Sequence, residues 1–361
     1  DVVNQFGLYI SANDSLLSLN GLNNLKSVEA CVRIQDNPML ESVADLENLA
    51  AIGTCINRNG TTTAYASLKI SDNTRLPSLS GLEQLDSLEY VVIERNDALN
   101  SLEGLKNLAY VKACININDN AALSSLQGLE SLGYVGAGTC YSSSGLGYSS
   151  RIKSLTISSN KALKSLAGLD KLSYAWGLTI EHNDSLQLIP GFASPFAIEN
   201  LTVSDNDALT ELSGLNEVDK INGDVAISKN PALTSLNGLG NLKSIGGDLS
   251  ILSNKALPNL NGLNQLESVG ENLNIGRTLS RQGTVWHWGP SNASLTSLSG
   301  LDALTTIGGH LTLSGNPALN SLGSLGNLAA IGGDLNLLSN KALPNLNGLD
   351  SLKSIAGYLK V

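Results

Sequence analysis

The sequence is poor in aromatic and charged side chains. Only 4% of its 361 residues are aromatic and 15% are charged, and there are three histidines and one methionine. Lysine and arginine number 22 against 32 aspartates and glutamates, which gives a net charge of −10. Because phosphate binding needs clustered basic residues and the sequence has no basic patch, we expect neither nucleic acid nor an anionic membrane as a partner.

Long hydrophobic runs are also missing. No apolar stretch reaches the roughly 18–20 residues of a membrane-spanning helix, and no basic-then-apolar leader precedes Asp1. We therefore expect no transmembrane segment, and we expect that a leader was removed or that the sequence is the mature part of the protein.

The residues that commonly carry catalysis are few and scattered. His182, His287 and His310 have no partner at nucleophile or metal-ligand spacing, and His-Glu-x-x-His is absent. The carboxylates of Asp36, Asp72 and Asp119 share one repeat position and could bind calcium weakly, but no calcium-loop signature accompanies them. We predict no enzyme activity, no cofactor and no metal site.

What the sequence has in abundance is a repeat. An asparagine recurs thirteen times in the frame Asn-x-[Ala/Ser/Met/Arg]-Leu, and nine of the twelve spacings are 23 or 24 residues. A fixed period in this range is typical of a solenoid. The asparagines are Asn13, Asn37, Asn73, Asn96, Asn120, Asn160, Asn183, Asn206, Asn230, Asn254, Asn292, Asn316 and Asn340.

One repeat, residues 245–269, shows the expected local structure. Its apolar residues come in short groups separated by glycine or asparagine, without a helical period. Leu249, Ser250 and Ile251 alternate as expected for a short strand with one buried face. The sequence therefore predicts an all-β fold: a right-handed parallel β-helix, or leucine-rich-repeat-like solenoid, that forms a rod of about 13–14 turns.

The repeated asparagine is interpreted as structural. A corner occurs once in every turn, and an inward amide there can satisfy backbone groups of the turn and the amides of neighbouring turns. The repeated Gly-Gly-Asp is interpreted as a turn with positive φ, because no helix follows it as in a phosphate-binding loop.

The middle residue of each strand should form an exposed column. This column is neutral and polar through its middle, and three successive threonines make ice binding a minor alternative. Its members are Tyr9, Arg33, Lys69, Val92, Asn116, Thr156, Thr179, Thr202, Ala226, Ser250, Asn274, Thr312, Asn336 and Lys360.

The four cysteines follow the repeat. Cys31 and Cys55 are 24 residues apart and Cys114 and Cys140 are 26 apart, so each pair falls on neighbouring turns. We predict two disulfides between turns, in preference to free thiols or a metal site, and an oxidising, secreted environment.

Three longer spacings predict loop insertions near residues 57–66, 141–152 and 277–291 of one elongated domain that covers residues 1–361. The third insertion holds Trp286, His287 and Trp288, two of the three tryptophans, which we interpret either as a partner-binding loop or as a cluster folded over the solenoid edge. Of five Asn-x-Ser/Thr sequons, Asn59 and Asn200 lie off the ladder and are the predicted N-glycan sites, whereas the ladder positions Asn13, Asn183 and Asn292 should be buried.

The frame Ile-Gly-Gly-Asp-Leu-x-Ile-x-x-Asn-x-Ala-Leu-x-x-Leu-x-Gly-Leu-x-x-Leu-x-x-Ile is clearest at residues 221–245, 245–269 and 307–331. It resembles receptor L domains, which are right-handed, leucine-rich-repeat-like β-helices. That family includes the ligand-binding lobes of insulin and epidermal growth factor receptors, fungal cell-wall proteins with a glycolipid anchor, and surface proteins of algae and bacteria. The chain resembles the cell-wall and surface branch more, because it lacks a cysteine-rich module and a kinase.

These observations predict a secreted or cell-surface structural or adhesive protein, part of a cell surface or filament. Its insertions and its ends, residues 1–10 and 355–361, would bind protein partners, including further copies of the chain end to end. The alternative is a receptor-like ectodomain that binds a protein or a glycan on the polar strand face or beside Trp286 and Trp288.

Overall fold

The computed structural model describes residues 7–54, 67–143, 149–277, 279–282 and 285–361. The chain divides into two compact units, of which unit 1 comprises residues 1–184 and 192–196 and unit 2 comprises residues 185–191 and 197–361. The predicted insertion at 57–66, with Asn59, lies outside the described residues, and so does Cys55.

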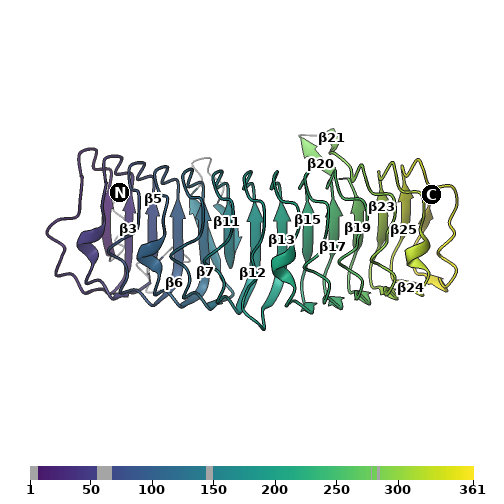
Figure 1. The fold of residues 1–361 in the computed structure, drawn as a ribbon, viewed down its shortest axis with the longest axis horizontal. Helices are drawn as coiled ribbons and strands as arrows, with labels where there is room; N and C mark the ends of the chain where they lie inside the picture. Colours follow the sequence, from purple (N-terminus) through teal and green to yellow (C-terminus); the bar gives the residue numbers. More distant parts are fainter. Residues whose placement is uncertain (1–6, 55–66, 144–148, 278, 283–284) are drawn as a thin grey trace. The chain divides into compact units, whose positions relative to one another are not determined.

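A parallel sheet runs through unit 1, with one strand in each turn of the chain (Figure 1). Leu68 and Ile70 pair with Val91 and Ile93 on the next strand, and all four side chains are fully buried. The strands, in sheet order, are β1 (Gly7–Ser11), β3 (Cys31–Gln35), β5 (Leu68–Ser71), β6 (Ser87–Glu94), β7 (Tyr110–Asn118), β11 (Leu155–Ser158) and β12 (Tyr174–Glu181), with β8 (Tyr134–Val135) paired to β7 and β12. A separate pair is formed by β2 (Ser27–Val28) and β4 (Ala51–Ile52).

Unit 2 contains two parallel stacks of strands. The longer strands are β13 (Ala197–Ser204), β15 (Val225–Ser228), β17 (Leu249–Leu252), β19 (Leu273–Gly276), β23 (Leu311–Ser314), β25 (Leu335–Leu338) and β27 (Leu359–Lys360). The second stack comprises β14 (Lys220–Ile221), β16 (Ser244–Ile245), β18 (Ser268–Val269), β22 (Thr306–Ile307), β24 (Ala330–Ile331) and β26 (Ser354–Ile355).

The hydrophobic interior follows the repeat. Leu249 and Ile251 pair in register with Leu273 and Ile275 and are buried, whereas Ser250 between them is partly exposed. The corners between strands add buried leucines, such as Leu257, 0% exposed. The prediction of an all-β parallel solenoid of about 13 turns is thereby confirmed.

The remaining elements are short. Four 3-10 helices of three residues occur at corners: η1 (Ala44–Leu46), η2 (Glu103–Leu105), η3 (Ser213–Leu215) and η4 (Gly323–Leu325). In the described residues, no helix is long and apolar enough to cross a membrane.

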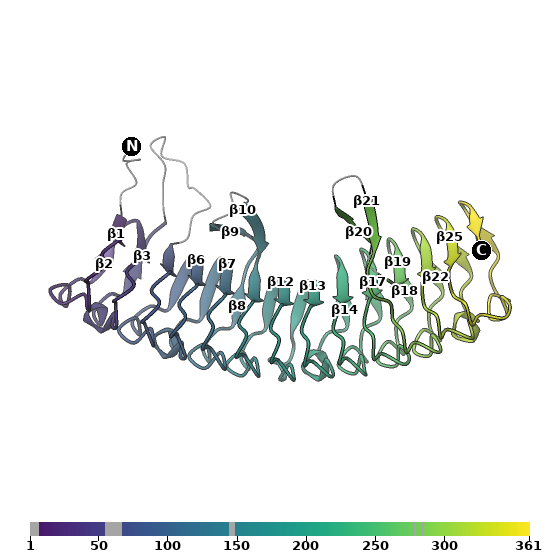
Figure 2. The same cartoon turned by 90° about the horizontal axis from the view of Figure 1, so that it is seen from above.

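Two of the predicted insertions form antiparallel hairpins (Figure 2). In unit 1, β9 (Thr139–Ser143) pairs with β10 (Ser149–Lys153). In unit 2, β20 (Leu279–Gln282) pairs with β21 (Val285–Trp288). The side chains of these hairpins are not described.

The prediction of positive φ for the Gly-Gly-Asp corners is wrong. Gly246 and Gly247 are absent from the positive-φ glycines, which instead include Gly262 of the Asn-Gly-Leu corner, at +112°. Glycine is required at 246 for a different reason, because a Cβ there would lie 2.1 Å from the carbonyl oxygen of Asn222 on the preceding turn. The missing side chain allows two turns to approach closely at this corner.

Candidate interaction surfaces

The repeated asparagines form a ladder of amides within each unit. The Oδ1 of Asn96 accepts hydrogen bonds from the backbone N–H and the Nδ2 of Asn73, at 3.2 and 3.3 Å. Its Nδ2 donates to the carbonyl oxygens of Ile70 and Glu94, at 3.0 and 3.1 Å, and to the Oδ1 of Asn120, at 3.3 Å. One buried amide therefore satisfies three backbone groups and links three consecutive turns.

The ladder is buried almost throughout. The fully buried asparagines are Asn37, Asn73, Asn96, Asn120, Asn160 and Asn183 in unit 1 and Asn206, Asn230, Asn254, Asn292 and Asn316 in unit 2. Asn340 is half-buried. Asn13 was predicted to be buried and is exposed, because among the described residues no turn precedes it to cover it.

Twelve of the thirteen ladder asparagines follow a residue in the left-handed region, the exception being Asn292, and most of these preceding residues are polar. The φ angle is +55° at Asp36 and +54° at Asp205, and aspartate tolerates this conformation better than most residues. The aspartates that share this position are therefore turn residues. Among the described residues, no group of three or more His, Cys, Asp or Glu side chains is placed to hold a metal ion.

A second column runs along a corner of unit 2, and the repeat pattern did not predict it. In each step a side-chain acceptor takes the backbone N–H of the residue one turn later, at 3.1, 2.9, 2.8, 2.8, 2.7 and 2.8 Å. The signal that could have revealed it is the polar third residue of the Gly-Gly-Asp frame. The members are Asn200, Asp224, Asp248, Asn272, His310, Asp334 and Tyr358.

This column includes two residues that the sequence analysis singled out, Asn200 and His310. The Oδ1 of Asn200 accepts the Asp224 N–H, and Asn200 is half-buried in β13, so its glycosylation stays a prediction. The Nδ1 of His310 accepts the Asp334 N–H at 2.7 Å.

The strand column predicted to be exposed is buried over part of unit 1. Lys69 is 8% exposed, Val92 1%, Asn116 0% and Thr156 4%. The hairpin β9–β10 lies close to β6, β7, β11 and β12, which carry most of these residues. The prediction failed here because strand alternation identifies the outward side of a sheet but not what an inserted segment places over it.

Ion pairs occupy this part of the outward face. Lys69 Nζ lies 2.8 Å from Glu94 Oε1, and the Glu94 side chain is fully buried. Arg95 contacts the same Glu94 oxygen at 3.1 Å and donates two hydrogen bonds to Asp72, at 2.7 and 2.9 Å. Hydrogen bonding to Asp72 raises the pKa of Arg95. Burial acts to raise the pKa of Asp72, but the Arg95 hydrogen bonds and charge lower it overall.

One buried polar side chain of the same face has no hydrogen-bond partner among the described residues. Neither the Nδ2 nor the Oδ1 of Asn116 is bonded there. A buried polar group without a partner costs about 1–3 kcal/mol. Within the described residues, the Asn116 amide therefore lacks a compensating hydrogen bond beside the ion pairs.

The outward face of unit 2 has a different chemistry. Its middle column contains no charged residue from β13 to β25, and its members are partly exposed: Thr202, Ala226, Ser250, Asn274, Thr312 and Asn336. The hairpin β20–β21 follows directly after β19, and its backbone pairs Trp286 with Arg281, His287 with Ser280 and Trp288 with Leu279. Binding by these three residues stays a prediction.

The side chains of two of the four cysteines, Cys31 and Cys114, can be placed in unit 1. Cys31 and Cys114 are both disulfide-bonded and fully buried, and the Tyr9 hydroxyl lies 3.2 Å from the Cys31 sulfur. Cys55 and the side chain of Cys140 lie outside the described part of the chain. The pairing of Cys31 with Cys55 and of Cys114 with Cys140 stays a prediction.

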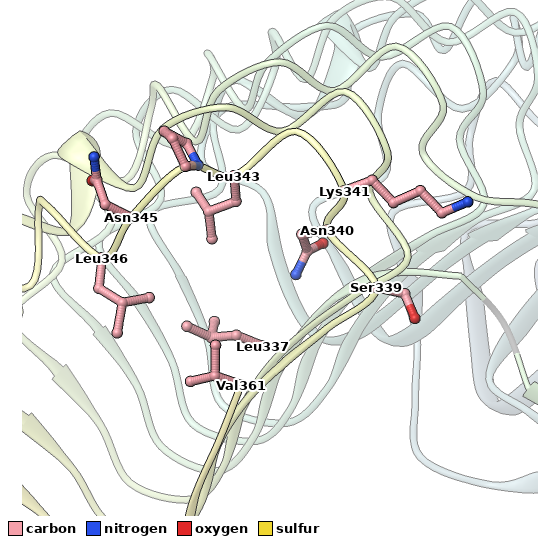
Figure 3. Close-up of a pocket in the computed structure, with 9 residues that line it drawn as sticks. Leu337, Ser339, Asn340, Lys341, Leu343, Asn345, Leu346 and Val361 are labelled. Atoms are coloured by element: carbon pink, nitrogen blue, oxygen red, sulfur yellow. The ribbon is translucent and has the colours of Figure 1, made fainter.

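The final turn of unit 2 exposes apolar side chains. Leu338 is 38% exposed, Tyr358 73%, Leu359 53% and Val361 77%, and β27 pairs with β25, while no other described strand pairs with it. A pocket of about 380 Å³ opens here, and Figure 3 shows the leucine side chains around it. Its lining is Leu337, Ser339, Asn340, Lys341, Leu343, Pro344, Asn345, Leu346 and Val361.

The first described turn of unit 1 has a similar surface. Leu17 is 54% exposed and Tyr9 39%. A pocket of about 330 Å³ is lined by Gly7, Leu8, Leu22, Leu25, Ser27, Val28, Glu29 and Ala30. Each unit thus has one turn on which leucines of the repeat are covered from one side only by the described residues.

Comparison with known proteins identifies no family. No protein-family model matches the sequence, and no curated protein matches it. Among solved structures, the chain is similar to an internalin from Listeria monocytogenes, with a TM-score of 0.30 and 16% sequence identity over 93% of this chain and 87% of the internalin chain. A TM-score this low adds nothing to the fold, which rests on the strand pairing of the chain itself.

Proposed function

We propose that the protein is a non-enzymatic structural or adhesive repeat protein of a cell surface or extracellular filament, and that it assembles with further copies of itself through its turn edges. The observation that carries this proposal is the apolar edge at β27, with Leu359 and Val361 more than half exposed. Among the described strands, β27 pairs on one side only, and such an edge beside exposed leucines is a template for pairing with another chain.

The partner that fits this edge best is the first turn of unit 1 in a second copy. Both edges carry parallel strands of the same repeat, and both open into leucine-lined pockets of similar volume, about 380 and 330 Å³. Joining them would continue the spacing of strands and leucines found inside each unit. Such a head-to-tail contact is heterologous, so repeating it generates a ring or an open filament.

The test is electron microscopy of the native protein together with its mass in solution. The wild type should form end-to-end oligomers, and Leu359→Glu should shorten them to monomers, because a carboxylate would be buried at the joint. Leu188→Glu is the matched control, since Leu188 is 43% exposed in unit 2 but lies outside both β27 and the edge pocket. A wild-type protein that stays monomeric at high concentration contradicts the proposal.

A receptor-like ectodomain is the second candidate. The uncharged, partly exposed face of unit 2 and the neighbouring tryptophan hairpin favour it. In that case the protein stays monomeric, and Trp286→Ala and Trp288→Ala weaken the capture of a protein or glycan ligand. The control is Trp176→Ala, because Trp176 lies on β12 of unit 1, outside the hairpin.

A further inference from the structure

Three tyrosines form a stack on one corner of unit 1. Tyr110, Tyr134 and Tyr174 occupy the same position in three consecutive turns. The rings of Tyr110 and Tyr134 are 4.7 Å apart and 6° from parallel, and those of Tyr134 and Tyr174 are 5.0 Å apart and 15° from parallel. A third of the nine tyrosines of the chain are therefore gathered in one continuous aromatic column.

The solenoid does not require aromatic residues at this position. The equivalent position of β14, β16, β18, β22, β24 and β26 in unit 2 holds Lys220, Ser244, Ser268, Thr306, Ala330 and Ser354. Those turns pair in the same parallel way with small or polar side chains. The tyrosines consequently add a surface property that is specific to this corner of unit 1.

The stack stops at Tyr110 and leaves one ring face uncovered. In the preceding turn, on β6, the residue that pairs with Tyr110 is Ser87, whose hydroxymethyl group is too small to cover a phenol ring. Tyr110 is 44% exposed and Ser87 is exposed. Since neighbouring strands are about 4.8 Å apart, the space above Ser87 has the height of one stacked ring.

Polar groups surround this space. The Ser87 hydroxyl donates a 2.8 Å hydrogen bond to the exposed carboxylate of Asp86. Lys112, two residues beyond Tyr110, pairs with Glu89 at 3.2 Å, and its side chain is 67% exposed. An aromatic face thus stands beside a hydroxyl, two carboxylates and an ammonium group, which together both donate and accept hydrogen bonds.

From this arrangement, we propose that the open face of Tyr110 is a binding subsite for a neutral carbohydrate, with a pyranose ring stacked on the phenol. One face of a pyranose presents C–H groups that can pack on the aromatic ring, and its edge carries hydroxyls that can bond to Asp86, Ser87 and Glu89. An aromatic partner side chain would desolvate the two carboxylates without bonding to them, at a cost. An anionic ligand such as a nucleotide would be repelled by them and by the net charge of −10.

The test measures the binding of cellotetraose, mannotetraose and chitotetraose, used as neutral probes, by saturation-transfer NMR and calorimetric titration. At least one probe should bind the wild type, with saturation transferred to its C–H face. Tyr110→Ser should weaken binding at least tenfold, whereas Tyr110→Phe should retain most of it because the ring face remains. Ser87→Leu should also block binding, since a leucine covers the ring while all three tyrosines stay in place.

The controls separate this site from the two functions proposed above. Trp286→Ala and Leu359→Glu should leave saccharide binding unchanged, whatever they do to ligand capture or assembly. Melting temperatures of all variants identify any that fail to fold. If Tyr110→Ser is unstable, the binding measured for Ser87→Leu tests the proposal in its place. If none of the three probes binds, or if Tyr110→Ser and Ser87→Leu both bind like the wild type, the stack is structural only and the proposal is overturned.

Discussion

The outward faces of the two units differ although the same repeat builds both. In unit 1, the strand positions of Lys69, Glu94 and Asn116 are buried and hold ion pairs and an amide that has no hydrogen-bond partner among the described residues. In unit 2, the corresponding column is partly exposed and uncharged from Thr202 to Asn336. The repeat thus determines which residues occupy the inward and corner positions. The burial of the outward positions differs between the two units.

The first way to test this comparison is to remove a ladder asparagine from each unit. Asn96→Ala in unit 1 leaves one backbone N–H and two carbonyl oxygens without the hydrogen bonds that the amide makes. Asn230→Ala in unit 2 removes the corresponding three hydrogen bonds. At about 1–3 kcal/mol for each buried unsatisfied group, we expect both variants to lose roughly 4 kcal/mol or more in the free energy of unfolding.

Urea unfolding followed by circular dichroism measures this loss. The control is Asn237→Ala, an exposed asparagine, which should change stability by less than about 0.5 kcal/mol. Losses that differ more than twofold between Asn96→Ala and Asn230→Ala would show that the ladder is not equivalent in the two units.

The second test compares substitutions at one outward position, two residues before the ladder asparagine, in the two units. Glu94 holds this position in unit 1 and Ser228 in unit 2. Glu94→Gln leaves Lys69 and Arg95 without their buried counter-charge, so we expect a loss of about 3–5 kcal/mol. Ser228→Ala should cost less than about 0.5 kcal/mol. Thermal and urea unfolding should rank the two variants in this order, and equal effects would contradict the contrast between the faces.

The third test should stabilise the protein. Asn116→Val removes two buried polar atoms that have no hydrogen-bond partner among the described residues and replaces them with the side chain already present at Val92 in the same column. We expect a gain of about 1–2 kcal/mol in the free energy of unfolding. Asn274→Val is the matched control in unit 2, where the residue is partly exposed, and its effect should be near zero. A loss of stability at position 116 would show that its amide has a structural role.

The sequence predicts most of the fold because most of the fold is periodic. Every inward position, such as Ile251, and every ladder asparagine recurs at a fixed offset, so its environment can be inferred from any other turn. The repeat does not predict the burial of Asn116 and Thr156, because the hairpin β9–β10 that lies close to β7 and β11 is inserted into it. The long asparagine spacing predicted this insertion but not the residues that it would cover.

The Gly-Gly-Asp frame and the three stacked tyrosines are visible in the sequence. Their roles follow only when the hydrogen bonds and contacts of each turn are known. The side chain of Asp248 accepts a hydrogen bond from the backbone N–H of Asn272. The aspartate of the Gly-Gly-Asp frame therefore belongs to the second column, at the corner of unit 2. The glycine before it is required by close contact between turns and not by positive φ. The stack of Tyr110, Tyr134 and Tyr174 could have been found by aligning the repeats, because all three tyrosines share one offset.

The smallest expected change in the free energy of unfolding concerns two ion pairs that occupy the same repeat position in the two units. Asp72 pairs with Arg95 in unit 1 through two hydrogen bonds of 2.7 and 2.9 Å, whereas Asp205 in unit 2 lies 3.4 Å from a half-exposed Lys229. Asp205→Asn should therefore change the free energy of unfolding by no more than about 1 kcal/mol, and Asp72→Asn should have the larger effect.

The pH dependence should distinguish the two pairs. Burial opposes ionisation of Asp72, but the Arg95 hydrogen bonds prevail and lower its pKa below 3.8. A carboxyl whose folded-state pKa is lowered stabilises the fold above its unfolded pKa, and this stabilisation is lost as the pH falls through the folded-state pKa. Urea unfolding between about pH 5 and pH 2 should thus show the wild type and Asp72→Asn converging in stability toward the acid end. A constant difference across this range would mean that Asp72 acts through its turn geometry at φ +59° and not through its charge.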